Sequence, residues 1–402
     1  MIHQESLKKR LAKLAAPIFI ETLLIMMLGA VDTIMLSRHS DSSVAAVGVV
    51  NQIIMLTFLV FEVINLGTSV LCSQYLGARL QKKVVQVVGV SILVNIVVGV
   101  SISLLLFFGA GPILRLMGLT SELMTDGMDY MRIVGAFAFF QAISLTLSAS
   151  LRSANKAIYP MLVTVVVNIL NIIGNYSLIF GRFGFPELGV EGAAISTAFS
   201  RGVSMILLFI ILFRKHIHRF PVAYFRPFPW IELKNLMKIG LPSAGEQLSY
   251  SSSQVVITFF INMLGVEALA TRTYCVNIIM FAYLFSISMA QGGAICIGHL
   301  IGEKKPHAAF LMGKYVMKKS SGSEPPSSSS TSFLKSDVPS IFSQQMPCVP
   351  PGMSPTPSMS VWLFSGALPS AWATSSVSLW SGESAVCGSP SCWTRTSVEP
   401  SS

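Results

Sequence analysis

Charged side chains are scarce in this chain of 402 residues. Asp, Glu, Lys and Arg make up 11% of it, whereas hydrophobic side chains make up 52%. Because about a quarter of the residues in soluble domains are charged, this composition excludes an ordinary soluble domain. Several windows supply the roughly 20 apolar residues that a helix needs to cross the hydrocarbon core of a bilayer. We therefore expect an all-α polytopic membrane protein.

Other patterns are also missing, and each absence argues against a class of function. The six cysteines form no CxxC pair or other metal-binding spacing, so they are interpreted as apolar side chains rather than as ligands or disulfides. The chain has no GxxxxGK loop for ATP and no strand–turn–helix context for a nucleophilic motif, so no enzyme and no resident cofactor are expected. The first apolar run lacks the cleavage pattern of a signal peptide, and we expect it to be retained as a span.

Basic residues give the chain a formal net charge of +10, and they are concentrated in alternate loops, whereas the intervening loops hold few Lys or Arg. Loops on the cytoplasmic side of membrane proteins are enriched in Lys and Arg, so the alternation predicts a cytoplasmic N-terminus and a location in the cell (inner) membrane. Because this topology accounts for the charge, nucleic-acid binding is not expected. The basic residues in these loops are Lys8, Lys9, Arg10, Lys13, Arg79, Lys82, Lys83, Arg152, Lys156, Arg214, Lys215, Arg219, Arg226, Lys304, Lys305 and Lys314.

The pattern of apolar runs predicts eight spans in two groups. A basic, proline-broken stretch follows the sixth span and is interpreted as a cytoplasmic linker. This organisation comprises a six-helix lobe over residues 1–215, a linker over 216–235, a partial second lobe of two helices over 236–318 and a tail over 319–402. The predicted spans are residues 14–37, 45–71, 84–110, 127–150, 157–180, 190–213, 238–262 and 270–298.

An internal repeat relates the two groups of spans. Pro17 is followed four residues on by Glu21, and Pro242, which lies 225 positions later, is followed four residues on by Glu246. Each copy ends on a glycine and a charged turn, QYLGAR in the first and HLIGEK in the second. Two related apolar halves are typical of secondary transporters.

The tail after about residue 319 does not continue the repeat. At the place of a third span it reads KSSGSEPPSSSSTSFLKS, and four of the five Trp residues follow. It contains no sustained apolar run of spanning length. It is either a natural disordered tail or the product of a frame shift near residues 318–320. We favour the frame shift because disordered segments are usually poor in aromatic residues. Translation of the other two frames of the gene tests this hypothesis.

Polar side chains inside the spans are the candidate site. Asp32 lies deep in the first span, where a carboxylate is costly unless it is paired or faces water; the alternative is an interfacial Asp near the outer helix end. On the fifth span, Asn168, Asn171 and Asn175 are three and four residues apart and share one helical face. Asn171 and Asn175 are predicted at the depth of Asp32, and Thr197 can reach the same layer. The asparagines either line a cavity, which we favour, or hydrogen-bond between helices.

A second polar group is predicted around the repeated Pro-to-Glu motif. Proline removes a backbone donor and permits bending, and polar residues continue beyond the second glutamate. Glu21, Asn168, Glu246, Gln247 and Tyr250 are therefore expected to line a central substrate cavity. The alternative for Glu21 is that its side chain reaches out to the membrane interface.

Five segments occur together in order: Pro17, residues 31–35 (VDTIM), 171–181, 189–194 (GVEGAA) and 240–242 (GLP). Because of these segments, the chain resembles the MATE family of multidrug and toxic compound extrusion antiporters. The resemblance extends from about residue 11 to residue 314. The resemblance implies a MATE-like two-lobe helical bundle, here with a complete six-helix N-lobe and an incomplete C-lobe. It also implies the exchange of H+ or Na+ for organic, often cationic, drugs by alternating access.

The resemblance carries roles onto particular positions. It implies that Asp32 is the acid of the first helix, that Asn171 and Asn175 are the fifth-helix pair, and that Thr197 lies near a sixth-helix ligand. These residues would couple H+, or bind Na+ at Asp32, Asn171 and Asn175. The family's acid on span seven lies one turn later than Glu246, at the position of Tyr250, and its tenth-helix acid has no counterpart. The expected partners are small organic cations and the lipid bilayer, and a monomer is expected.

Three alternatives remain open. A flippase for a lipid-linked oligosaccharide shares the two-lobe plan, but it would be expected to line its cavity with several Arg or Lys, which the predicted spans lack. An ion channel would not need acids at matched places in two halves. A non-functional fragment of a transporter also fits, because only eight spans are predicted; efflux assays comparing this chain with a frame-restored version would decide.

Overall fold

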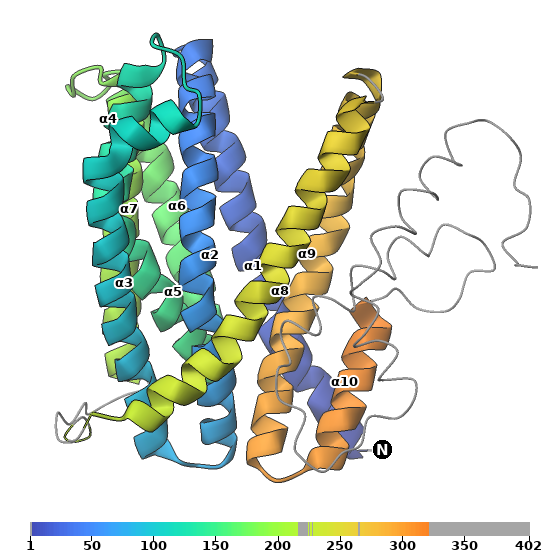
Figure 1. Ribbon diagram of the computed structural model, residues 1–402. Coiled ribbons are helices and arrows are strands. Elements are labelled where there is room, and N and C mark those ends of the chain that lie inside the picture. Colours follow the sequence, from blue (N-terminus) through green and yellow to red (C-terminus); the bar gives the residue numbers. More distant parts are fainter. Residues whose placement is uncertain (1, 216–223, 225, 227, 264–265, 321–402) are drawn as a thin grey trace, which may run out of the picture.

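The computed structural model describes residues 2–215, 224, 226, 228–263 and 266–320. Within these ranges the chain forms ten α-helices and no strand (Figure 1). Almost all of the tail predicted over residues 319–402, and half of the linker predicted over 216–235, lie outside the described residues. The helices are α1 (Ile2–Ser37), α2 (Asp41–Gly77), α3 (Gln81–Leu116), α4 (Met124–Ala136), α5 (Ala138–Ser153), α6 (Ile158–Ile179), α7 (Gly189–Lys215), α8 (Trp230–Met263), α9 (Val266–Gly302) and α10 (Pro306–Ser320).

The predicted spans correspond to these helices in chain order. Among the described residues, six helices are long and apolar enough to cross a membrane, namely α1, α2, α3, α6, α7 and the second part of α9. The bent pair α4 and α5 makes a seventh. Helix α8, predicted as the seventh span over residues 238–262, is not among them. An all-α polytopic membrane protein is therefore confirmed, although the seventh predicted span is not established by length and composition among the described residues.

The fourth predicted span is not one straight helix, as residues 127–150 led us to expect. It is broken at Phe137, and its two parts, α4 and α5, are bent by 45°. Side chains of α3 explain why the break is tolerated. The Phe139 backbone N–H, which lies just past the break, donates to Ser103 Oγ over 3.2 Å. A backbone donor released inside a membrane helix is thus satisfied by a neighbouring hydroxyl.

Two further helix boundaries differ from the sequence prediction. Helix α8 begins directly after Pro229, inside the predicted linker, because a proline before the first turn costs no helical hydrogen bond. Helix α10 adds a third helix to the region 236–318, where two were predicted. With 15 residues it is shorter than a span, so a search for long apolar runs overlooks it.

The two copies of the repeat fold alike at the turns that end α2 and α9. The backbone N–H of Ala78 donates to the Gln74 carbonyl, and the N–H of Glu303 donates to the His299 carbonyl, both over 2.9 Å. The next residue in each turn has the same left-handed φ of 59°. Each of these residues lies 225 positions from its counterpart, so the repeat read from the sequence is also a repeat of backbone geometry.

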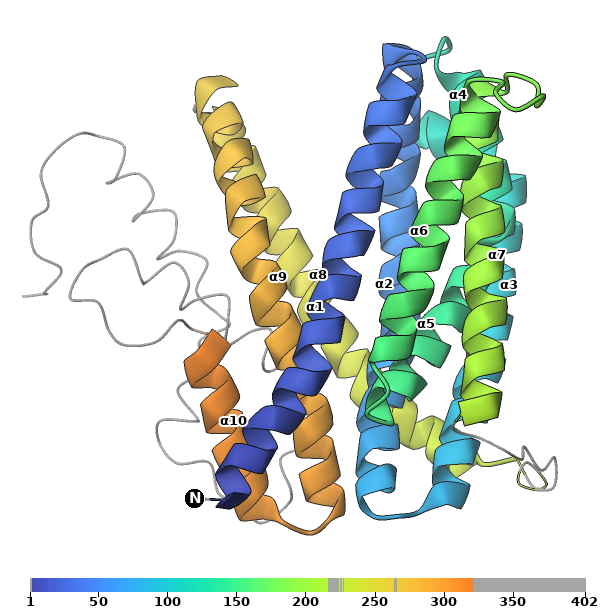
Figure 2. The same ribbon diagram turned by 180° about the vertical axis from the view of Figure 1, so that it is seen from behind.

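The helices form two groups that meet at one end. Helices α1 to α7, the first half, stand together as a bundle, whereas α8 and α9 cross its edge and lean away, with α10 beside α9 (Figure 1, Figure 2). Contact between the groups runs through α1 and α2: α1 packs against α9, and α2 packs against both α8 and α9. We call α8 to α10 the second half. The halves diverge toward the end of the molecule opposite the N-terminus (Figure 2).

Three apolar clusters hold this arrangement. The first lies within α2, α3, α4 and α7 of the first half, and the second brings Leu236 and Ile239 of α8 against α2, α3 and α5. The third joins Leu11, Leu14 and Ile18 of α1 to α9 and α10. Because the first turns of α1 belong to the third cluster, α1 packs with the second half at its beginning and with α6 further along.

Candidate functional site

The carboxylate of Asp32 on α1 lies against the amide of Asn175 on α6. Asn175 Nδ2 donates to Asp32 Oδ1 over 2.7 Å, and the same nitrogen donates to Asn171 Oδ1 over 3.0 Å. Both asparagines are buried and Asp32 is partly buried. The structure therefore brings together the acid and the asparagine pair that the sequence placed at one depth.

Side chains of helix α7 extend this network of hydrogen bonds. Asn171 Nδ2 donates to Thr197 Oγ1 over 3.4 Å, and Ser196 Oγ donates to the Asn171 backbone carbonyl over 3.0 Å. Gly174 lets α6 and α7 approach, since a Cβ there would overlap the Ser196 side chain. The candidate ion-coupling site thus consists of Asp32, Asn171, Asn175 and Thr197, and it connects α1, α6 and α7.

Arg201 of α7 is a cation beside this site that the sequence interpretation missed. It lies one turn after Thr197, close enough to Asp32 for the two opposite charges to attract each other. Its Cζ lies 5.4 Å from the centre of the Phe58 ring, and its Nη1 is buried without a hydrogen-bond partner among the described residues. The rule that selected Asp32, an ionisable residue inside an apolar run, could have found it.

Arg201 also corrects the statement that the predicted spans lack Arg and Lys. Arg201 lies within the span predicted over 190–213, and Arg132 lies within the span predicted over 127–150. Arg132 is exposed on α4, whereas Arg201 is largely enclosed and faces a carboxylate. A buried cation with a partner of opposite charge is the arrangement expected inside a membrane protein.

Glu21 belongs to a separate cluster, eleven residues before Asp32 and so about 16 Å along the helix. Its side chain is buried, and its Oε1 lies 3.7 Å from Arg152 Nη2 of α5. Arg152 Nη1 also donates to Gln291 Oε1 of α9 over 3.2 Å. Glu21 therefore does not reach the membrane interface. Arg152, which the charge pattern assigned to a loop, lies in the last turn of α5 and pairs inside the protein.

The remaining residues predicted for the substrate cavity are spread over different contacts. Asn168 Nδ2 donates to the Leu24 backbone carbonyl of α1 over 2.8 Å, so it bonds between helices, the alternative to lining a cavity. Glu246, Gln247 and Tyr250 are partly buried on α8, which packs mainly against α2 rather than α6. A cavity of about 790 Å³ near the N-terminus is lined by other residues. The five residues are thus distributed over α1, α6 and α8, and their role as the lining of a substrate cavity stays a prediction.

Oxygen atoms dominate the candidate site, which suits a hard cation such as Na+. Asn175 Oδ1 is buried and has no hydrogen-bond partner among the described residues. A half-turn of the amide would direct this oxygen, in place of Nδ2, toward Asp32. In the described part of the chain no three His, Cys, Asp or Glu side chains form a metal cluster, so amide and hydroxyl oxygens of Asn171, Asn175 and Thr197 would have to complete the ligand set.

Comparison with known proteins identifies the family. The family model described as MatE matches residues 17–177 and 242–345. The chain is 45% identical over 300 residues to the uncharacterized transporter YisQ of Bacillus subtilis (strain 168), which covers 75% of this chain and 66% of that protein. It is 30% identical over 286 residues to the probable multidrug resistance protein NorM of Thermotoga maritima, covering 71% and 61%. The chain thus spans less than two thirds of the length of these two relatives.

A solved structure shows the same fold. The outward-facing conformation of a multidrug resistance MATE family transporter of the MOP superfamily matches this structure with a TM-score of 0.71 and 26% sequence identity. The match covers 78% of this chain and 69% of that one. Both copies of the repeat fall within the family match, which also continues past the described residues. On the evidence of its sequence repeat, its two-half helical fold and these similarities, the chain belongs to the MATE family.

Proposed function

We propose that this protein exports small organic molecules, among them drugs and toxic metabolites, in exchange for H+ or Na+. The NorM relative is named a probable multidrug resistance protein, and the similar structure is titled a multidrug resistance transporter. The proposed substrates are organic cations, because carboxylates at Asp32, Glu21 and Glu246 lie in or near the spans. The proposed setting is a monomer in the inner membrane with the N-terminus and the basic loops in the cytoplasm.

The contact between Asp32 and Asn175 carries this proposal. An ionised carboxylate accepts a short, charge-assisted hydrogen bond, whereas a protonated or cation-bound carboxylate is a weaker acceptor. The charge state of Asp32 therefore changes how strongly α1 is held to α6. A change of charge at one residue can bias a bundle between two packings when those packings differ in their contacts.

Arg201 gives the change of charge a second consequence. While Asp32 is ionised, its negative charge attracts the guanidinium of Arg201, which is partly buried on α7. When a proton or Na+ neutralises Asp32, Arg201 loses its counter-charge, and an unpaired charge inside the membrane is costly. Entry of the coupling ion thus disfavours the present packing of α1 on α6 and α7. A second packing of these helices, in which Arg201 is exposed to water, would complete the exchange cycle.

Substitution of Asp32 tests the proposal directly. Asp32→Asn removes the titratable charge but keeps the shape and a hydrogen-bonding side chain. We expect ion-driven efflux of a fluorescent organic cation from membrane vesicles to be lost, while membrane insertion stays at the wild-type level. Asp41→Asn is the matched control, because Asp41 is an exposed carboxylate in the first turn of α2. Retained efflux in Asp32→Asn would refute the assignment.

The same vesicles separate the remaining choices. An imposed pH gradient without Na+ and an imposed Na+ gradient at constant pH distinguish the two coupling ions. An organic anion of similar size tests the preference for cations. If wild-type vesicles show no efflux under either gradient while a frame-restored chain does, the alternative of a non-functional fragment holds.

The flippase alternative is less well supported by the contacts. Arg152 is already paired with Glu21, and the charge of Arg201 is partly offset by Asp32. Binding of a pyrophosphate needs cations that are free of such partners. The two arginines nearest to the candidate site and to Glu21 are therefore poorly suited to a lipid-linked pyrophosphate.

A further inference from the structure

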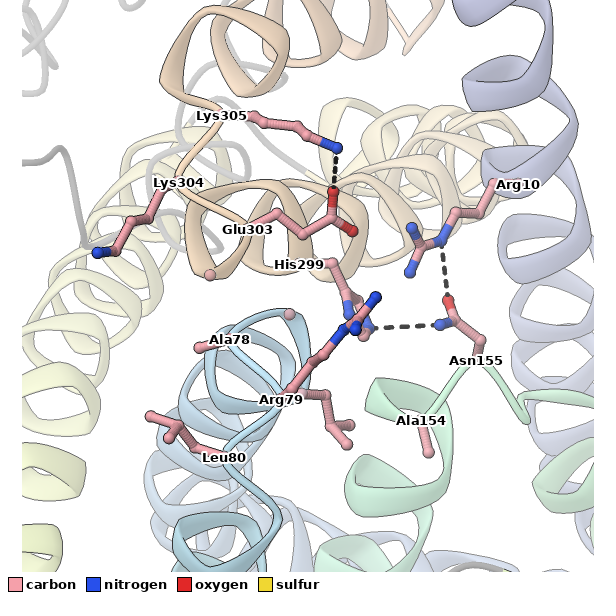
Figure 3. Close-up of a pocket in the computed structure, with 13 residues that line it drawn as sticks. Arg10, Ala78, Arg79, Leu80, Ala154, Asn155, His299, Glu303, Lys304 and Lys305 are labelled. Atoms are coloured by element: carbon pink, nitrogen blue, oxygen red, sulfur yellow. Dashed lines mark hydrogen bonds and ion pairs between the residues drawn. The ribbon is translucent and has the colours of Figure 1, made fainter.

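A cavity of about 790 Å³ opens at the end of the molecule that carries the N-terminus (Figure 3). Its walls come from both halves: α1, the turn after α2 and the turn after α5 from the first half, and the end of α9 with the turn that follows it from the second. By the charge pattern of the loops this end faces the cytoplasm. The cavity is distinct from the candidate ion-coupling site, with which it shares no residue.

Positive charge dominates the cavity. Four of its lining residues are cations, Arg10, Arg79, Lys304 and Lys305, and one is a carboxylate, Glu303. Lys305 Nζ donates to Glu303 Oε2 over 2.8 Å. This hydrogen bond lowers the pKa of Glu303, so the carboxylate stays ionised and is committed chiefly to Lys305. In the described part of the chain, neither Arg79 nor Lys304 has a carboxylate partner.

The two guanidinium groups point into the same space. Figure 3 shows Arg10, from α1, and Arg79, from the turn after α2, directed toward the region beside His299. Arg10 Nε donates to Asn155 Oδ1 over 3.4 Å, a contact with a neutral group, and Arg10 forms no ion pair with a described carboxylate. His299 Nε2 is already engaged with the Ser153 carbonyl at 2.7 Å. Two like charges thus converge on a cavity where no carboxylate forms an ion pair with either of them.

Backbone carbonyl groups at the helix ends beside the cavity could offset its positive charge, but here they are already hydrogen-bonded. Helices α2 and α9 both end here, and the exposed carbonyls of a helix C-terminus repel anions. In both turns these carbonyls accept hydrogen bonds from the turn itself: Leu80 N–H donates to the Tyr75 carbonyl, and Lys305 N–H donates to the Leu300 carbonyl, each over 2.9 Å. The carbonyls are therefore satisfied, and the basic side chains set the potential of the cavity.

We propose that this cavity binds a phosphate group, free or on the headgroup of an anionic phospholipid, through the guanidinium groups of Arg10 and Arg79. Guanidinium is planar and presents paired donors that match phosphate oxygens. Lys304, at the position that repeats Arg79, lines the rim from the second half. Bound phosphate therefore stabilises the packing in which the turns after α2 and α9 touch and the two halves diverge at the opposite end.

A titration of the purified full-length chain in a neutral detergent tests this proposal. The readout is the midpoint of thermal unfolding at constant ionic strength, since a ligand that binds only the folded protein raises it. The probes are inorganic phosphate, with chloride as its reference, and dihexanoyl phosphatidic acid, with dihexanoylglycerol as its reference. A stronger effect of phosphatidic acid assigns a lipid phosphate, whereas equal apparent affinities assign free phosphate.

Three variants make the test specific. Arg79→Gln is expected to weaken phosphate binding at least about tenfold, which corresponds to about 1.4 kcal/mol. Glu303→Gln is expected to tighten it, because Lys305 is released and a negative charge is lost. Lys314→Gln, at an exposed lysine of α10 outside the cavity, is expected to leave it unchanged. The opposite signs at Arg79 and Glu303 cannot arise from a general loss of folding.

Two results would overturn the proposal. The first is that neither phosphate probe raises the unfolding midpoint of the wild type above its reference. The second is that Lys314→Gln weakens binding as much as Arg79→Gln does, because the effect would then be due to net charge rather than to the cavity.

Discussion

Gly77 of α2 and His299 of α9 meet backbone to backbone at the contact between the two halves. A Cβ placed on Gly77 would lie 2.8 Å from both the carbonyl carbon and the Cα of His299. Real Cβ atoms do not approach other atoms so closely, so the glycine is required by the packing rather than by a turn. The counterpart Gly302 lies equally close against Gln74 of α2. The repeated glycines therefore set how closely α2 and α9 cross.

Gly77→Ala is expected to lower the free energy of unfolding by about 1–3 kcal/mol, the usual cost of forcing an extra methyl group into a packed contact. Thermal unfolding of the purified protein measures the effect. Gly48→Ala is the matched control on the same helix, because nothing lies within 4 Å of a Cβ at that position. There alanine should be neutral or stabilising, as is usual in a helix interior. Equal destabilisation by both variants would contradict the close crossing.

Asn175→Ala is expected to uncouple transport from the driving ion. The substitution removes the donor to Asp32 Oδ1 and leaves the carboxylate in place, so the dependence of efflux on the ion gradient should be lost. Asn168→Ala is the control on the same helix, since its amide bonds only to the Leu24 backbone carbonyl. That variant should transport more slowly or unfold earlier, yet keep the gradient dependence. The measurement is initial efflux rate against imposed gradient in vesicles.

Asp32 and Arg201 should be energetically coupled. Arg201→Gln removes the positive charge nearest to the Asp32 carboxylate, so we expect it to lower the midpoint of thermal unfolding. The double variant Asp32→Asn with Arg201→Gln removes both charges and should be more stable than the sum of the single effects predicts. Thermal unfolding of the wild type, the two single variants and the double variant gives the coupling energy of this double-mutant cycle. Additive effects would show that the two charges do not stabilise each other.

A comparison of two ion pairs tests the role of burial. Glu21 and Arg152 are 3.7 Å apart with side chains that are 7% and 14% exposed, whereas Glu303 and Lys305 are 2.8 Å apart with side chains 32% and 51% exposed. Glu21→Gln should lower the free energy of unfolding by about 3–5 kcal/mol, because it leaves the buried guanidinium of Arg152 without its counter-charge. Glu303→Gln should cost about 1 kcal/mol or less despite the shorter distance. If thermal unfolding shows a larger loss of stability for Glu303→Gln than for Glu21→Gln, burial does not decide the strength of these ion pairs.

Local properties of the chain were sufficient for much of the fold. Long apolar runs predict helices that cross a membrane, and the ends of these runs fall close to the turns after α1, α2 and α9. The break at Phe137 could not be predicted this way, because it depends on a hydroxyl from α3 at Ser103 that accepts the freed backbone N–H. Helix α10 was overlooked because its stability comes from packing against α9, not from a spanning apolar run.

The amino-acid sequence was enough to show which side chains are exceptional: a carboxylate and three asparagines in apolar helices, and matched glycines at a fixed offset of 225 residues. Their partners became known from the packing of the helices. This packing separated Glu21 from Asp32, paired Glu21 with Arg152, bonded Asp32 to Asn175 and gave Asn168 a backbone partner. The physical reason is that the cost of burying a polar group is a property of the residue and its segment, whereas the group that offsets this cost is supplied by another helix, whose rotation and depth are fixed only when the helices pack.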